Sequence, residues 1–141
     1  MGERPAPGAH GAALVVLVAC AFSAGIHLAL IPRHAEESAN LGVAFGLSGV
    51  LLLVLAIAVY TRPRSAAAAL ATALLLASLI GAYLLSRGAG LPGTDHGPEP
   101  FNAIGVLTKV VELAALAAAA RLYIVDHRSW SRPLPKTRSS T

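Results

Sequence analysis

Residues 41–60 read LGVAFGLSGVLLLVLAIAVY, a stretch of twenty residues without a charged side chain. An α-helix rises about 1.5 Å per residue, so a helix of this length crosses the roughly 30 Å of hydrocarbon in a bilayer. A helix on the surface of a soluble bundle would carry a polar stripe along one face, and this stretch carries none. The stretch therefore predicts a transmembrane helix.

The same apolar character continues in three further stretches, at residues 11–31, 65–85 and 103–125. The first is uncharged apart from His27, the second has no charge, and the third contains Lys109, Glu112 and Arg121. Over the 141 residues, 55% are hydrophobic and 13% are charged, against about 25% charged in a typical soluble domain. This composition excludes a disordered chain, a disulfide scaffold, a coiled coil and most soluble enzymes. It predicts an integral membrane protein with four spanning helices.

The connections predict how these helices are arranged. Residues 61–64 form a short turn and residues 32–40 a polar connection of nine residues, so each joins antiparallel neighbours. We therefore expect an all-α, up-down-up-down four-helix bundle in which the last helix closes against the first. The third connection, residues 86–102, holds seven Gly or Pro residues, which prevents a regular helix. We expect it to form an ordered cap on the outer mouth of the bundle.

The basic residues predict the orientation of the bundle. One side of it carries eight of them: Arg4, Arg62, Arg64, Arg121, Arg128, Arg132, Lys136 and Arg138. By the positive-inside rule both termini are cytoplasmic, residues 1–10 as an N-terminal tail and residues 126–141 as a disordered basic tail. These residues also contact anionic lipid headgroups. No basic stripe is interleaved with stacking aromatic residues, so nucleic acid is not expected as a partner.

Small residues at four-residue spacing predict close helix packing, because helices in membranes associate where their backbones approach each other. The sets are Ala21, Gly25 and Ala29; Gly42 and Gly46; Ala69, Ala73, Ala77 and Gly81; and the pairs Ala114/Ala118 and Ala115/Ala119. The spacing fits contacts within the bundle, in a homo-oligomer or in a larger membrane complex.

The single cysteine, Cys20, ends the stretch LVAC at residues 17–20, which resembles the lipobox before a lipidated cysteine. The apolar run continues through residue 31, whereas a cleavage region gives way to a polar mature chain. We interpret Cys20 as a small packed residue, with lipidation as the alternative.

The polar residues inside the predicted spans gather at a similar depth. Counted inward, His27 lies about 7 Å below the outer end of the first helix, and Lys109 and Glu112 lie about 9 and 13 Å below that of the last. Gly105, Thr108, Lys109 and Glu112 share one helical face. We expect this face to point into the bundle, where the first and last helices are neighbours.

An ionised side chain near the bilayer centre costs at least about 3 kcal/mol, so Glu112 needs a partner or a proton. Two interpretations are open. Lys109 pairs locally with Glu112 while its stem reaches outward, or Glu112 binds a proton, a cation or a ligand in a cavity. The candidate ligand-binding residues are His27, Arg87, Lys109 and Glu112.

A metal site at the outer mouth is a further hypothesis. His27 and His34 are seven residues apart and share a face if the helix continues through Pro32. With Glu37 and His96 they supply the imidazole and carboxylate groups that suit zinc, copper or iron.

Haem is not expected, because only one histidine lies within a span. The GxSxG motif, the phosphate loop and the dinucleotide fingerprint are absent from the sequence, so we expect a non-enzymatic protein.

Two ordered sets of residues are similar to a known family. They are His27-x4-Pro32-x-His34-x2-Glu37 followed by Gly42 and Phe45, and Tyr83-x2-Ser86-Arg87-x2-Gly90-Leu91-Pro92-Gly93 followed by Glu112. Together they resemble a family of small four-helix bacterial integral membrane proteins, over residues 11–125. The resemblance implies the same fold and no established activity, and it marks His27, His34, Glu37, Arg87 and Glu112 as positions to test. After Gly93, where such proteins often have a bulkier loop, this chain has Thr94-Asp95-His96-Gly97-Pro98.

The function expected from the sequence is that of a multi-pass protein of the bacterial plasma membrane with a polar ligand- or metal-binding site in its outer half. One alternative is an accessory or structural subunit that docks a larger membrane complex through its small-residue faces. Another is a quinone-linked redox subunit, on a likeness of layout alone.

Overall fold

The computed structural model describes residues 8–90 and 97–130, and this part of the chain forms five α-helices and no strand. The helices are α1 (Ala9–Ala29), α2 (Ile31–Glu37), α3 (Ala39–Thr61), α4 (Ala66–Gly88) and α5 (Ala103–Trp130). All except α2 are long and apolar enough to cross a membrane. The prediction of an all-α fold with four candidate membrane spans is confirmed.

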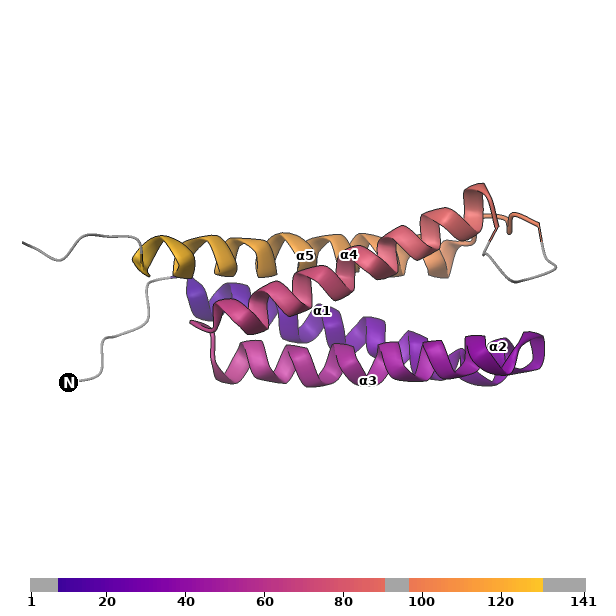
Figure 1. Ribbon diagram of the computed structural model, residues 1–141, viewed down its shortest axis with the longest axis horizontal. Helices are drawn as coiled ribbons and strands as arrows, with labels where there is room; N and C mark the ends of the chain where they lie inside the picture. Colours follow the sequence, from indigo (N-terminus) through magenta and orange to yellow (C-terminus); the bar gives the residue numbers. More distant parts are fainter. Residues whose placement is uncertain (1–7, 91–96, 131–141) are drawn as a thin grey trace, which may run out of the picture.

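The four long helices lie along the long axis of the molecule and alternate in direction (Figure 1). α1 packs against α3 and α5, and α4 packs against α5, so the last long helix closes against the first. α3 and α4 contact each other much less, and α4 diverges from α3 toward the end of the molecule where α2 lies (Figure 1).

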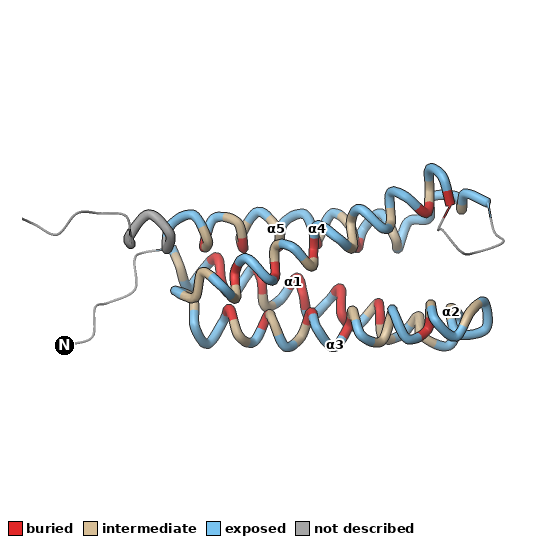
Figure 2. The backbone as a smooth tube through the Cα atoms, in the orientation of Figure 1, coloured by how far each residue is buried: buried red, intermediate tan, exposed pale blue. Residues whose placement is uncertain are grey.

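The core is narrow and consists mostly of small side chains, which allow the helix backbones to approach closely. Its buried members are Ala12, Ala13, Val16, Ala19, Cys20, Ala24, Leu52, Ala56, Val59, Ala69, Leu76, Ala115, Ala119 and Leu122. Buried positions recur along the facing sides of the helices, while the outward sides are exposed (Figure 2). Many exposed residues are large and apolar, among them Val18, Leu47 and Leu74.

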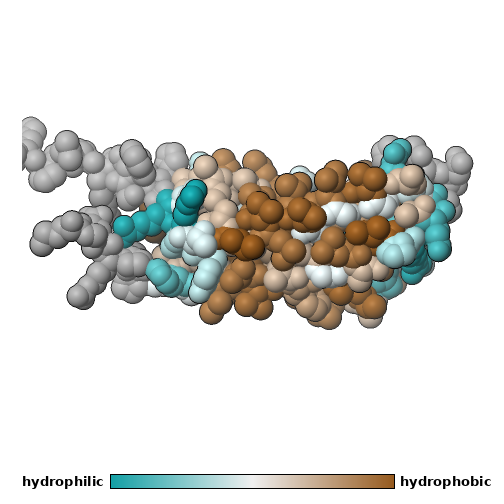
Figure 3. All heavy atoms as spheres, turned by 90° about the horizontal axis from the view of Figure 1, so that it is seen from below, coloured by the Kyte–Doolittle hydropathy of each residue, from teal (hydrophilic) through white to brown (hydrophobic). Residues whose placement is uncertain are grey.

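The exposed apolar side chains form a band around the middle of the molecule on the face shown in Figure 3, with hydrophilic residues at both ends. In water such a continuous apolar surface would be unusual for a monomer. In a bilayer it is the surface that meets the lipid tails, and the helices satisfy their own backbone hydrogen bonds. The band is therefore consistent with a multi-pass membrane protein.

The small-residue sets divide between the inside and the outside of the bundle. Gly42 is buried against α2, and a Cβ added to it would lie 2.7 Å from the Cβ of Ala35. Ala21, Gly25 and Ala29 are exposed, and nothing lies within 4 Å of a Cβ added to Gly25. Spacing by four residues alone therefore does not identify the packed face of α1.

The polar connection at residues 32–40 is largely helical, because α2 occupies Ile31–Glu37. Pro32 lies in the first turn of α2, where a backbone N–H has no partner within the helix and its absence costs nothing. The break between α1 and α2 falls at Leu30, so α1 ends two residues before the predicted residue 31.

The third connection begins later than predicted, because α4 continues to Gly88. Gly90 follows with φ +81°, a left-handed conformation that glycine adopts without strain, and its N–H donates to the carbonyl of Leu85. Residues 91–96 lie outside the described residues. The second half of the connection returns to α4, since the N–H of Glu99 donates to the carbonyl of Ser86 at 3.1 Å.

The prediction of a disordered tail from residue 126 is wrong for its first part, because α5 continues to Trp130. Bilayer thickness limits the apolar part of a helix, but it does not limit backbone hydrogen bonding, which here continues into polar sequence. Residues 131–141 and the tail at residues 1–7 lie outside the described residues.

Candidate functional site

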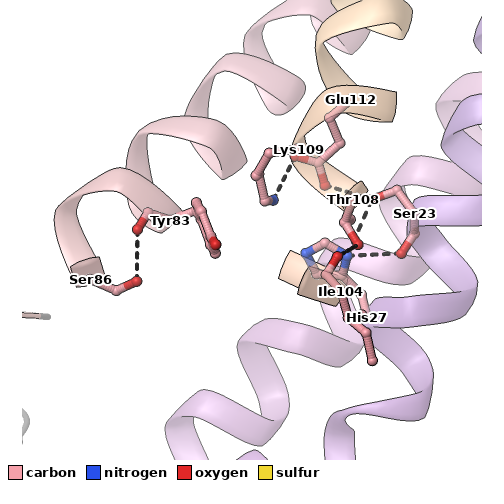
Figure 4. A network of polar contacts seen from close by, with 8 residues as sticks. All are labelled: Ser23, His27, Tyr83, Ser86, Ile104, Thr108, Lys109 and Glu112. Carbon is pink, nitrogen blue, oxygen red and sulfur yellow. Dashed lines mark hydrogen bonds and ion pairs between the residues drawn. The ribbon is translucent and has the colours of Figure 1, made fainter. Parts of the chain in front are cut away.

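A fully buried carboxylate lies at the centre of the polar cluster in Figure 4. Glu112 of α5 is 0% exposed. The hydroxyl of Ser23 in α1 donates to Glu112 Oε1 at 2.6 Å, and Lys109 Nζ, one turn earlier in α5, donates to Oε2 at 2.6 Å. The local Lys109–Glu112 pair is therefore present, and Ser23 adds a donor from a second helix.

The face of α5 that carries Glu112 points inward, as predicted. Thr108 is 2% exposed and donates its hydroxyl to the carbonyl of Ile104 at 2.7 Å, so it is satisfied within its own helix. The Lys109 side chain is 14% exposed. The i, i+3 spacing places Lys109 on the same side of α5 as Glu112, which is why the two charges meet without strain.

His27 joins the cluster through Ser23, which lies one turn earlier in α1. The Nδ1 atom of His27 is 2.9 Å from the carbonyl oxygen of Ser23, to which it donates, and 3.4 Å from the Ser23 hydroxyl. Since Nδ1 carries the proton, Nε2 of the neutral ring keeps its lone pair. A carbonyl behind the ring in this way also orients histidines that bind metals.

His34 lies outside this cluster. Its ring stacks on Phe45 of α3 with 3.8 Å between centroids, and its Nδ1 donates to the carbonyl of Leu30 at 3.0 Å. The ring of His27 contacts the same Phe45 at 5.3 Å between centroids. Phe45 is therefore in contact with both histidines that the metal hypothesis names.

Glu37 does not form a metal-binding group with these two histidines. Glu37 pairs with Arg33 at 3.9 Å in a solvent-exposed ion pair. Across the side chains that the structure describes, in residues 8–90 and 97–125, His, Cys, Asp and Glu form no group of three or more that could hold a metal ion. His96 lies outside the described residues, so the four-residue site with His27, His34, Glu37 and His96 stays a prediction.

Tyr83 and Arg87 of α4 form the outer part of the cluster. The Arg87 side chain is 9% exposed and pairs with Glu99. Arg87 Cζ lies 4.8 Å from the centroid of the Tyr83 ring, and Lys109 Nζ lies 5.5 Å from it. The ring packs against Gly105 of α5, where an added Cβ would lie 2.8 Å from Tyr83 Cε2. Tyr83 thus connects one cation from α4 with another from α5.

Two donors in this outer part are buried without a partner. They are Tyr83 Oη and Arg87 Nε, and neither is hydrogen-bonded within the part of the chain that the structure describes. Buried polar groups nearly always have a partner, and an unsatisfied one costs about 1–3 kcal/mol. The described residues therefore leave the hydrogen-bonding capacity of these two donors unused.

Ser23 and Tyr83 are site residues that were not expected from the sequence. Both have a signal that could have found them: Ser23 is a polar residue four positions before His27, and Tyr83 is an aromatic residue four positions before Arg87. Residues four apart on a helix lie on the same face, so a polar residue at that spacing from a candidate is itself a candidate.

Comparison with known proteins gives no relative, since no protein-family model, no curated protein and no solved structure matches the chain. The family resemblance stays a prediction.

Proposed function

We propose that this chain is a multi-pass protein of the bacterial plasma membrane, with both termini in the cytoplasm, that binds a small ligand or a metal ion in the outer half of the bundle and is not an enzyme. The binding residues are His27, Arg87, Lys109 and Glu112. The observation that carries the proposal is the fully buried Glu112 carboxylate on a candidate membrane span, bonded from two helices.

The alternative, that the polar cluster serves only to hold the helices together, explains fewer of its features. Helix packing in this bundle is achieved by small apolar residues and needs no charge. An ionisable residue at this depth is costly to insert, by at least about 3 kcal/mol. A structural ion pair would also leave no neighbouring donors unsatisfied, whereas Tyr83 Oη and Arg87 Nε have no partner among the described residues.

The proposed orientation rests on the distribution of basic residues. The turn between α3 and α4 holds Arg62 and Arg64, and the last turns of α5 lie at the same end of the bundle, which carries more Arg and Lys than the end that holds Arg33 and Arg87. Under the positive-inside rule the end richer in Arg and Lys is cytoplasmic.

Cysteine labelling in whole cells tests this orientation, in a Cys20→Ala background. A membrane-impermeant maleimide should label Glu36→Cys in intact cells and Arg64→Cys only after permeabilisation. The reverse pattern would overturn the proposed topology.

Retention of a ligand tests the proposed binding. Wild type, Glu112→Gln and His27→Ala are purified in detergent, and each is analysed for metals by elemental analysis and for small molecules by mass spectrometry. We expect a metal or molecule at near-stoichiometric amount in wild type and at least a several-fold loss in both variants, with unchanged elution on size exclusion. Glu37→Gln, at an exposed carboxylate, is the control and should retain it. Equal amounts in all four proteins would refute the proposal.

An accessory role in a larger complex has one observation in its favour, the exposed small-residue face Ala21, Gly25 and Ala29 on α1. Small exposed residues let a second helix approach closely. Crosslinking in native membranes would then capture a stoichiometric partner, and Gly25→Leu would abolish the product while Gly11→Leu, outside this face, would not. Absence of any crosslinked product in wild type would refute this role.

A further inference from the structure

We infer that the outer part of the cluster, formed by Tyr83, Arg87 and Lys109, binds a neutral, membrane-soluble molecule through its carbonyl oxygens, the chemistry of a quinone headgroup. This inference rests on the proposed function and names the class of ligand. It is carried by two features: the donors that have no partner among the described residues, and the balance of charge around them.

The donors determine what kind of atom the ligand must present. The Arg87 side chain is more than nine-tenths buried, and its Nε has no hydrogen-bond partner among the described residues. The same is true of the buried hydroxyl of Tyr83. An ammonium group has three N–H donors, and Lys109 uses one of them on Glu112. The cluster therefore offers several donors close to one aromatic ring, and a complementary ligand carries acceptor oxygens.

The charge balance determines whether that ligand is an anion. Arg87 is paired with Glu99, and Lys109 with Glu112, so the two cations are each neutralised by a carboxylate. A phosphate or carboxylate ligand would have to displace one of these acids or lie beside both, with repulsion that grows as water is excluded. A carbonyl oxygen accepts from the free donors without disturbing either pair, so the geometry favours a neutral ligand.

The aromatic surroundings suit a flat ring in particular. The ring of Phe101 meets Tyr83 edge to face with 6.2 Å between centroids, and aromatic rings prefer such offset or edge contacts with one another. By contrast, the open groove of about 440 Å³ lined by Leu14, Val15, Val18, Ala19, Phe22 and Val111 is entirely apolar, so nothing in it selects one lipid chain over another.

Binding of decylubiquinone, a neutral membrane-soluble dicarbonyl, tests the inference. The protein is immobilised in phosphatidylcholine nanodiscs, and retained quinone is extracted and compared with that of empty nanodiscs. Wild type should bind saturably above this background. Tyr83→Phe removes one hydroxyl and no other atom, and should weaken binding by about 3- to 10-fold, the worth of one hydrogen bond. Tyr60→Phe, at an exposed tyrosine of α3, should leave binding unchanged.

Three outcomes would overturn the inference. One is quinone binding that does not saturate or that is equal in wild type and Tyr83→Phe. A second is binding of inorganic phosphate, or of phosphatidylglycerol added to the nanodisc, that depends on Tyr83 while decylubiquinone does not bind; the site would then take an oxyanion. The third is no binding of any probe together with a higher melting temperature of Tyr83→Phe, which would mean that only water meets the hydroxyl.

The inference and the proposed function fail in different ways. A metal that is lost in Glu112→Gln and kept in Tyr83→Phe would support the proposed function and refute this ligand class. Quinone binding that depends on Tyr83 supports the ligand class even if detergent-purified protein retains nothing, since a lipid-soluble ligand can be lost during extraction.

Discussion

Replacement of Lys109 by Met tests whether the charge pair in the bundle is as strongly buried as the structure indicates. Glu112 is 0% and Lys109 14% exposed, so Lys109→Met leaves a carboxylate inside the bundle with Ser23 as its remaining donor. Met keeps most of the volume of the Lys stem and removes the charge. The chain also holds a matched control, the Arg33–Glu37 pair of α2, whose side chains are 77% and 32% exposed.

The expected magnitudes differ because burial differs. Breaking one partner of a buried pair costs about 3–5 kcal/mol, and inserting an unpaired acid at the centre of a span costs about 2.5–3.5 kcal/mol. Since Ser23 still donates to Glu112, we expect Lys109→Met to lower the free energy of unfolding by about 3 kcal/mol. Arg33→Met breaks an exposed pair and should cost less than about 1 kcal/mol.

The double variant Lys109→Met/Glu112→Gln separates the effect of charge from that of side-chain loss. Gln still accepts from Ser23 and carries no charge, so the double variant should regain all but about 1 kcal/mol of the stability lost in Lys109→Met. Unfolding is measured by titration with sodium dodecyl sulfate from mixed micelles, followed by circular dichroism. A cost for Lys109→Met no larger than that of Arg33→Met, or a double variant less stable than the single one, would refute a buried, mutually compensating pair.

Three glycine substitutions give further predictions. Gly42→Ala places a Cβ 2.7 Å from the Cβ of Ala35 and 3.0 Å from its Cα, so it should cost about 1–3 kcal/mol and speed hydrogen exchange in α2. A Cβ added at Gly25 meets no atom within 4 Å, so Gly25→Ala should leave the free energy of unfolding unchanged or raise it by up to about 1 kcal/mol. Equal changes in stability for Gly42→Ala and Gly25→Ala would contradict the packing of α2 on α3. Gly105→Ala meets the end of the Tyr83 side chain at 2.8 Å and Asn102 Oδ1 at 3.1 Å, both of which can move. It should therefore change thermal stability little, yet weaken decylubiquinone binding at least as much as Tyr83→Phe; unaltered binding would show that the position of this ring does not matter.

The spans could be predicted from the sequence because hydrophobic length is a local property. Residues 41–60 and 65–85 are predicted within three residues of the ends of α3 and α4. What lies just outside the apolar stretches could not be predicted in the same way. A polar stretch such as the one around Pro32 is compatible with a loop or with a new helix, and the contact of Gly42 with Ala35, which involves α3, favours the helix. A hydropathy profile contains no information about such a contact between two helices.

The site shows the same division between local and non-local information. The i, i+3 spacing within α5 predicts that Lys109 and Glu112 are neighbours, and the structure places them 2.6 Å apart. The donation from Ser23 to the same carboxylate crosses 89 positions of sequence, and it depends on the rotation of α1 about its axis. The exposed Ala21, Gly25 and Ala29 show that this rotation is not set by small-residue spacing. The inward face is instead the one that carries Ser23 and His27.

The local ion pair and a ligand site, which the sequence presents as alternatives, are compatible in this arrangement. Lys109 neutralises Glu112 with one of its three donors, so the pair keeps the interior free of net charge and still leaves donors beside Tyr83. A bilayer tolerates buried polar groups when charge is compensated, and a neutral ligand is recognised by hydrogen bonds that remain unmade. It follows that Glu112 reports on stability as well as on binding. Tyr83→Phe breaks no hydrogen bond within the described residues, so any loss of binding in this variant is not explained by a loss of stability.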